Sequence, residues 1–209
     1  MNMDGNSIPY DANNFEVNFP FNSTIVVTTA IPKRLKLDKE QYKELWSTHP
    51  PTRFVGGPST KKSVERYMAG SGKSYKHEGG LPEIKHPLID ATFDYIHQFT
   101  NQKYNGVIVN YYVNGADFIS AHSDDPNDLV DDSFIFGFSY GCPRTLRITL
   151  HTVNHPEALV PKAYDILLPN NSMYIMSAEM QRHWKHEIVK DVAGNRNKSR
   201  ISKTYRNFK

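Results

Sequence analysis

The 209-residue sequence lacks the features that mark secreted or membrane proteins. Its one cysteine, Cys142, cannot form a disulfide within the chain, which is usual in reducing compartments. No apolar run approaches the ~20 residues that span a bilayer. The N-terminus, MNMDGNSIPYDANN, does not follow the charged-then-apolar pattern of a signal peptide. We therefore expect a soluble, intracellular monomer, in the cytoplasm or the nucleus, with no membrane association.

The chain also lacks a strong excess of charge, since 25 Lys and Arg oppose 22 Asp and Glu. The basic residues nevertheless gather in short clusters, at 33–39, 61–66, 73–76 and 196–209. Such clusters fit contacts to a phosphate backbone. A solvated surface explains them equally well.

The N-terminal half predicts few regular elements within what we expect to be a single domain, 1–209. Residues 1–20 are polar and rich in asparagine, and are expected to form a loose arm. Residues 21–103 should supply a strand at 24–29, two helices and a hairpin. A capping box at Asp38 and Gln41 opens the first helix, which extends to about Trp46. Pro87 opens the second, with apolar residues at helical spacing to residue 100.

From residue 104 to the end, the sequence changes to short β-branched and aromatic segments separated by polar turns. They are 106–113, 118–122, 134–140, 144–150, 164–168, 172–177, 184–189 and 200–206. Eight such segments are typical of a sandwich or barrel. The predicted fold class is α+β, mainly β, with an antiparallel core buttressed by N-terminal helices.

A His-x-Asp motif, His122-Ser123-Asp124, ends one predicted strand. Residues i and i+2 of a strand share a face, so both side chains can reach one metal ion. Imidazole and carboxylate ligands on an open face suit non-haem Fe(II). Composition alone predicts about one His-x-acid pair in this chain. A second pair, His155-Pro156-Glu157, falls in a proline-containing connection, so position favours His122.

A third ligand has to come from another strand, and RHWKHEIV offers His183 and His186. His186 shares a strand face with Trp184 and Ile188, whereas His183 lies near the start of the strand. A histidine packed against tryptophan is the alternative interpretation of either residue.

Arg200 and Arg206 lie six residues apart in RISKTYR, and so on one strand face. Two guanidinium groups facing a core are costly unless anions meet them, and a dicarboxylate would suit both. Asn110 and Tyr112 have the i, i+2 spacing on an earlier strand and could complete such a site. Solvated arginines and ordinary polar strand residues are the alternatives.

As a set, these residues resemble the AlkB family of Fe(II)/2-oxoglutarate dioxygenases. Its N-x-Y…G…H-x-D-D run is matched by Asn110, Tyr112, Gly115 and the segment 122–125. The likeness continues through FSYGCPRTLRI, SMYIMS, HWKH and the terminal R-x-x-x-x-x-R, and covers roughly 104–208. It implies a double-stranded β-helix, or jelly-roll, core at 104–209.

The resemblance also implies roles and a reaction. His122, Asp124 and His186 would bind iron, and a second set would bind 2-oxoglutarate: Asn110, Tyr112, Arg200 and Arg206. In that family, O2 cleaves 2-oxoglutarate to succinate and carbon dioxide, and an N-methyl group of a nucleobase is hydroxylated and lost as formaldehyde. The expected function is therefore N-demethylation of alkylated bases in DNA or RNA.

The expected substrate contacts lie in a variable hairpin at 64–77. Candidates for base stacking and phosphate contacts are Arg66, Tyr67, Lys73, Tyr75 and Lys76. Pro126 stands where many relatives place a base-reading acid, so the base is left open. Two other functions stay open: an oxygenase of the same chemistry acting on protein or a small molecule, and a non-catalytic nucleic-acid-binding module.

Overall fold

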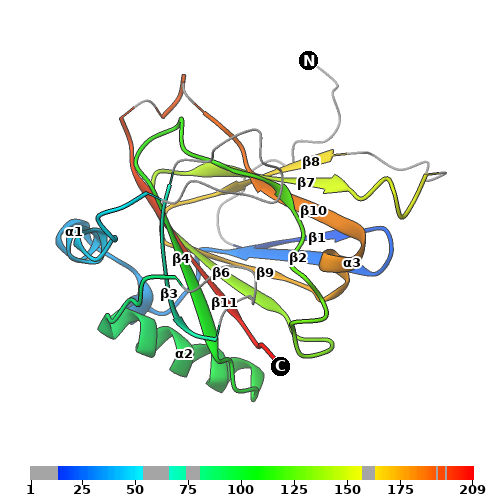
Figure 1. Ribbon diagram of the computed structural model, residues 1–209, viewed down its shortest axis with the longest axis horizontal. Coiled ribbons are helices and arrows are strands. Elements are labelled where there is room, and N and C mark those ends of the chain that lie inside the picture. Colours follow the sequence, from blue (N-terminus) through cyan, green and yellow to red (C-terminus); the bar gives the residue numbers. More distant parts are fainter. Residues whose placement is uncertain (1–13, 54–65, 74–80, 157–162, 192, 196) are drawn as a thin grey trace.

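Two antiparallel sheets face each other and make up the body of the protein (Figure 1). The computed structural model describes residues 14–53, 66–73, 81–156, 163–191, 193–195 and 197–209. The large sheet has seven strands in the order β1-β2-β9-β6-β11-β4-β3, and the small sheet four in the order β5-β10-β7-β8. This arrangement confirms the predicted jelly-roll core.

The strands of the large sheet are β1 (Asn14–Phe19), β2 (Ser23–Thr28), β3 (Tyr67–Gly72), β4 (Gly106–Tyr112), β6 (Ile135–Gly141), β9 (Ser172–Met176) and β11 (Arg200–Arg206). Those of the small sheet are β5 (Ile119–His122), β7 (Arg144–Leu150), β8 (Ala163–Leu168) and β10 (Trp184–Ile188). All eight strands predicted in the C-terminal half are present, within two residues of the expected bounds.

The helices are η1 (Lys33–Leu35), α1 (Lys39–Ser47), α2 (Pro87–Thr100) and α3 (Glu179–His183). The predicted capping box of α1 is confirmed, since the side chains of Asp38 and Gln41 each accept from the other residue's backbone N–H. Pro87 begins α2 as predicted. Helix α2 lies along the outer face of the large sheet (Figure 1). No helix in the described ranges has both the length and the apolar character needed to cross a membrane.

Strand alternation gives the large sheet two different faces. Its inner face, with Ile108 and Tyr112, packs against the small sheet, whose Ile148 and Trp184 belong to the same core. Its outer face, with Val109 and others, packs against α1 and α2 in a second core. A polar side chain on an inner position is thus enclosed between the two sheets.

The structure corrects one expectation for the N-terminal half and adds a helix that was not predicted. The loose arm at 1–20 is wrong for residues 14–19, which form β1 and pair in full register with β2. Helix α3 was not predicted, because five residues are too few to show helical periodicity. The expected hairpin at 64–77 is described at 66–73, where β3 pairs with β4, and its remaining residues lie outside the described ranges.

A buried lysine lies between the large sheet and α2. Lys203 is 0% exposed, and its Nζ donates to Oγ1 of Thr92 at 2.8 Å. The rings of Phe138, Tyr140 and Tyr205 surround the ammonium group, with centroids 5.2–5.6 Å away. Burial lowers the pKa of Lys203 well below its ordinary value. The unfolded chain therefore binds this proton more tightly than the folded chain does.

Replacing this amine with an apolar group of similar size should stabilise the fold. We expect Lys203→Met to raise the free energy of unfolding at pH 7 by about 1–4 kcal/mol, as for other buried charged groups. The gain should shrink as pH rises toward the ordinary lysine pKa of about 10.4, because the unfolded chain then also loses the proton. Urea unfolding at several pH values measures both. Lys85→Met, at an exposed position, is the control; an equal, pH-independent gain in both variants would contradict the assignment to burial.

Candidate metal and cosubstrate site

Three potential metal ligands converge between the two sheets. His122 ends β5, Asp124 follows two residues later, and His186 lies directly opposite His122 on the neighbouring strand β10. One ligand atom from each of the three lies within 4.8 Å of the others. The two imidazole centroids are 4.3 Å apart. Two histidines and one carboxylate on one side of a site are the donor set typical of non-haem Fe(II).

The surroundings keep all three groups in the form that binds a cation. Burial lowers the pKa of His186 to about 3, with a further contribution from His122. Burial also lowers the pKa of His122, although Asp124 acts against it. The Nδ1 of His122 lies 2.9 Å from the carbonyl oxygen of Ser120. Because a carbonyl only accepts, Nδ1 carries the proton and Nε2 presents its lone pair to a metal.

The Asp124 carboxylate is held from the large sheet by an arginine. Nε and the NH2 group of Arg206 donate to its two oxygens at 2.9 and 3.2 Å. Burial alone would raise the pKa of Asp124, but Arg206 and the two histidines outweigh it and keep the pKa well below its ordinary value. The structure thus pairs Arg206 with the protein's own Asp124. The predicted contact of Arg206 with 2-oxoglutarate stays a prediction.

Arg200 lies at the other end of β11 and, unlike Arg206, pairs with no carboxylate in the described residues. It is 0% exposed, and its Nε donates to Oγ of Ser139 at 3.0 Å. Both of its terminal guanidinium nitrogens are buried without a hydrogen-bond partner among the described residues. Buried polar groups are rarely left unpaired, so an unsatisfied guanidinium fork in a core fits an added carboxylate.

The other predicted cosubstrate residues also face this space. Asn110 and Tyr112 lie on the inner face of β4, and the Tyr112 ring centroid is 5.1 Å from the Arg200 guanidinium. The Asn110 oxygen accepts from Nε of Arg66 at 2.6 Å. Asn110 and Tyr112 thus share the inner face of the large sheet with Arg200 and Arg206, and Arg206 contacts the metal cluster through Asp124. The role of these four residues in binding 2-oxoglutarate remains a proposal.

His183 does not join the cluster. Its Nδ1 is 2.8 Å from Nε2 of His155, and its Nε2 is 3.2 Å from Glu179. His155 in turn stacks on Phe21, with ring centroids 4.0 Å apart. These contacts place His183 in a separate group of side chains, so the geometry favours His186 as the third ligand.

Only part of the expected substrate set lies near the metal cluster. Arg66 is buried on the inner face beside Asn110, not at a surface where it would meet a phosphate. Tyr67 lies on the outer face, stacked on His49 at 4.3 Å, so base stacking at the metal is not supported. Lys73 lies at the far end of β3, where its Nζ donates to the Lys209 carbonyl. Tyr75 and Lys76 lie outside the described residues.

Two residues of the site were missed in the sequence. Tyr174 of β9 is buried, and its ring fills the space that the absent side chain of Gly137 leaves open. Burial raises its pKa, while the nearby Arg200 lowers it. Alternation within SMYIMS could have placed Tyr174 inward. Gln181, whose Oε1 accepts from the backbone N–H of Asp124, lies in the unpredicted α3 and had no such signal.

Comparison with known proteins identifies the family. A model of the 2OG-Fe(II) oxygenase superfamily matches residues 22–206, nearly the whole described chain. The chain belongs to the 2OG-Fe(II) oxygenase superfamily. It is an AlkB-like dioxygenase, and the chemistry of this superfamily uses Fe(II), 2-oxoglutarate and O2.

Among relatives of this oxygenase are two DNA oxidative demethylases named ALKBH2. The Homo sapiens protein is 27% identical over 104 residues, which are 49% of this chain and 40% of that protein. The Mus musculus protein is 30% identical over 105 residues, 49% of this chain and 43% of that protein. The matched segment therefore spans less than half the length of these relatives.

Solved structures share the fold of this oxygenase. The match to the structure of OsALKBH1 covers 88% of this chain and 96% of the OsALKBH1 chain, with a TM-score of 0.52 and 14% sequence identity. The match to an oxidoreductase of the 2OG-Fe(II) oxygenase family from Burkholderia pseudomallei covers 88% of this chain and 84% of that protein's chain, with a TM-score of 0.51 and 12% sequence identity. At these identities the likeness shows the fold alone.

The ligand set makes a direct prediction for metal binding. We expect His122→Ala, Asp124→Ala and His186→Ala each to abolish stoichiometric Co²⁺ binding, because a site with two remaining ligands holds the ion weakly. His183→Ala should keep it, since its ring bonds elsewhere. Titration followed by the visible Co²⁺ bands measures this. Loss of binding in His183→Ala with retention in His186→Ala would show that the third ligand is wrong.

Substitutions of Arg200 and Arg206 should have different effects on cosubstrate and metal binding. Arg200→Met should raise the 2-oxoglutarate concentration for half-maximal succinate formation about 10- to 100-fold, the usual cost of losing a charge-assisted pair, with Co²⁺ affinity unchanged. Arg206→Met should weaken the binding of both 2-oxoglutarate and Co²⁺, because it leaves Asp124 without its buried partner. Arg147→Met, at an outward position paired with Asp165, is the control. An unchanged 2-oxoglutarate requirement in Arg200→Met would contradict the carboxylate role.

Proposed function

We propose that this oxygenase removes methyl groups from ring or exocyclic nitrogens of alkylated nucleobases in DNA or RNA. The observation that carries the proposal is the combination of a His-Asp-His cluster, which Arg206 of β11 contacts, with a buried guanidinium on the same face of β11 that has no partner for two of its nitrogens in the described residues. The similarity to DNA oxidative demethylases supports a nucleic-acid substrate. A catalytic family argues against the alternative of a non-catalytic binding module.

In this proposal the metal ligands and Arg206 have separate roles. His122, Asp124 and His186 would hold Fe(II) by three ligands, which leaves the opposite side open for 2-oxoglutarate and O2. When bound, this group supplies the oxidation of an N-methyl C–H bond. Arg206 keeps Asp124 ionised and oriented throughout, because it neutralises a carboxylate that burial would otherwise protonate.

Binding of 2-oxoglutarate would depend on the large sheet. A carboxylate of the cosubstrate would satisfy the two terminal nitrogens of Arg200 that lack a partner in the described ranges, and Ser139 orients this guanidinium through Nε. Asn110 and Tyr112 offer an amide and a phenol on the same inner face. Arg66 fixes the Asn110 side chain by donating to its oxygen, so the amide nitrogen of Asn110 points to other partners.

A base in a duplex has to leave the stack before its methyl group can reach a cluster enclosed by two sheets, at a cost of about a few kcal/mol. At the position where many relatives place a base-reading acid, this chain has Pro126. Asp125 accepts from both the backbone and side-chain nitrogens of Asn127, so it is bound within its own turn. Pro126 is exposed at the rim of a neighbouring hollow.

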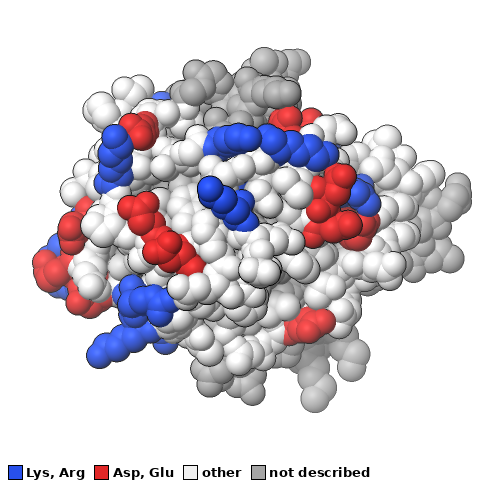
Figure 2. Space-filling model, turned by 90° about the horizontal axis from the view of Figure 1, so that it is seen from below, with Lys and Arg blue, Asp and Glu red and all other residues white. Residues whose placement is uncertain are grey.

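The distribution of charged side chains bears on which face of the molecule could bind nucleic acid. On the face seen from below, basic and acidic side chains are scattered among uncharged ones and form no continuous basic surface (Figure 2). A phosphate backbone favours a continuous basic surface, so this face is a poor candidate. An intracellular, monomeric enzyme completes the proposal; one cysteine in 209 residues supports the intracellular part.

A panel of methylated oligonucleotides tests the function. The protein with Fe(II), ascorbate and 2-oxoglutarate should release formaldehyde and succinate in equal amounts with at least one methylated DNA or RNA strand. Unmethylated strands of the same sequence should give neither above background. Mass spectrometry of the product base identifies the substrate, and His186→Ala is the inactive control.

Different results separate the alternatives. Succinate formation that no methylated DNA or RNA strand stimulates would favour the second candidate, an oxygenase acting on protein or a small molecule. No iron-dependent turnover of 2-oxoglutarate by a folded sample would count against both.

A further inference from the structure

One buried amide joins two parts of the metal cluster that are far apart in the sequence. Gln181 lies in α3, five residues before His186, and is 4% exposed. Its Oε1 accepts from the backbone N–H of Asp124 at 3.0 Å, in a fully buried hydrogen bond. This bond links the turn that carries Asp124 to the helix that leads into β10.

The backbone of Asp124 has no strand ladder to hold it. Strand β5 ends at His122, and β6 begins only at Ile135. Between them, residues 123–125 have no regular structure. A buried backbone N–H needs an acceptor, and here a side chain supplies it. Arg206 fixes the carboxylate of Asp124, while Gln181 fixes its backbone.

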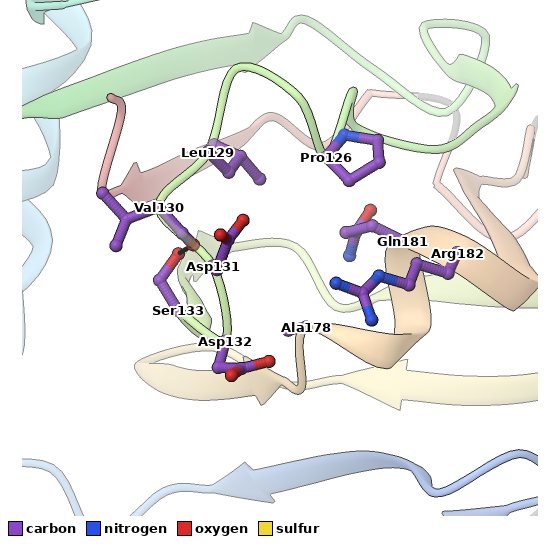
Figure 3. Close-up of a pocket in the computed structure, with 9 residues that line it drawn as sticks. All are labelled: Pro126, Leu129, Val130, Asp131, Asp132, Ser133, Ala178, Gln181 and Arg182. Carbon is purple, nitrogen blue, oxygen red and sulfur yellow. Dashed lines mark hydrogen bonds between the residues drawn. The ribbon is translucent and has the colours of Figure 1, made fainter.

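The side-chain amide of Gln181 can take only one orientation. Nε2 of Gln181 is buried and has no hydrogen-bond partner in the described residues. It lies at the wall of a hollow formed by the 126–133 loop and α3, between Pro126 and Arg182 (Figure 3). Turning the amide over would place a donor against the donor of Asp124. Oε1 therefore stays on the Asp124 side.

We propose that Gln181 is a positioning residue for the metal: it holds the Asp124 ligand in register with His122 and His186. This inference rests on the proposed metal role of these three residues. Groups that hold ligands in place, without touching the ion, commonly change metal affinity by about 10- to 100-fold when removed.

Three substitutions at one position isolate the acceptor. Gln181→Met keeps the volume and removes the oxygen. Gln181→Asn keeps an amide but is one methylene too short to reach, and serves if the Met variant does not fold. Gln181→Glu restores an acceptor at full length. Arg182→Met is the matched control, because Arg182 lies on the same helix and lines the same hollow, while its side chain donates to Glu179.

Co²⁺ titration of the full chain, followed by its visible bands, gives affinity and ligand geometry without turnover. We expect Gln181→Met and Gln181→Asn to weaken binding about 10- to 100-fold and to alter the bands. Hydrogen exchange at the Asp124 amide should accelerate in the same variants. Gln181→Glu should bind close to wild type, and Arg182→Met should match wild type in all three measurements.

The possible failures are distinct. Unchanged affinity and bands in a folded Gln181→Met or Gln181→Asn variant would overturn the positioning role while leaving the metal site intact. Weak binding in Gln181→Glu equal to that of Gln181→Met would also overturn it, since an acceptor would then not matter. If wild type and His186→Ala bind Co²⁺ equally, the metal site itself is wrong, and the role of Gln181 falls with it.

Discussion

The buried ion pair between Arg206 and Asp124 is the interaction on which the site depends. It joins the last strand of the large sheet to a turn that follows the first strand of the small sheet, with both partners about 5% exposed or less. An unpaired carboxylate at this depth would take up a proton, and a neutral acid is a poor ligand for a cation. The pair thus keeps the metal ligand ionised and connects the two sheets at the cluster.

Strand β11 places basic side chains on both faces of the large sheet. In β11, Arg200 and Arg206 occupy inner positions, and Lys203 an outer one. Arg206 meets a carboxylate and Lys203 is enclosed by aromatic rings. Arg200 alone keeps two buried nitrogens without a partner in the described part of the chain. Two unpartnered nitrogens on one buried guanidinium fit a ligand that would complete their hydrogen bonds.

Much of the site could be predicted from short-range rules. The alternation of strand faces placed Asn110 with Tyr112 and Arg200 with Arg206, and each of these pairs lies on one face in the structure. It also placed His122 with Asp124, whose side chains do converge, although Asp124 lies beyond the end of β5. The boundaries of the C-terminal strands followed from β-branched and aromatic segments between polar turns. The strand at 14–19 was missed because its asparagines and exposed positions hide an alternation of only two buried residues, Val17 and Phe19.

The sequence by itself determined which residues share a strand face, since a two-residue period is a property of the extended chain alone. It also determined the family, through a set of motifs in a fixed order. The resemblance already favoured His186 over His183, and the tertiary structure gives the physical reason, because the register of β10 against β5 places His186 opposite His122. Only the packing of the sheets separated the roles of two equivalent arginines and brought Gln181 to Asp124. These contacts join residues 57 to 82 positions apart, and no local pattern encodes them.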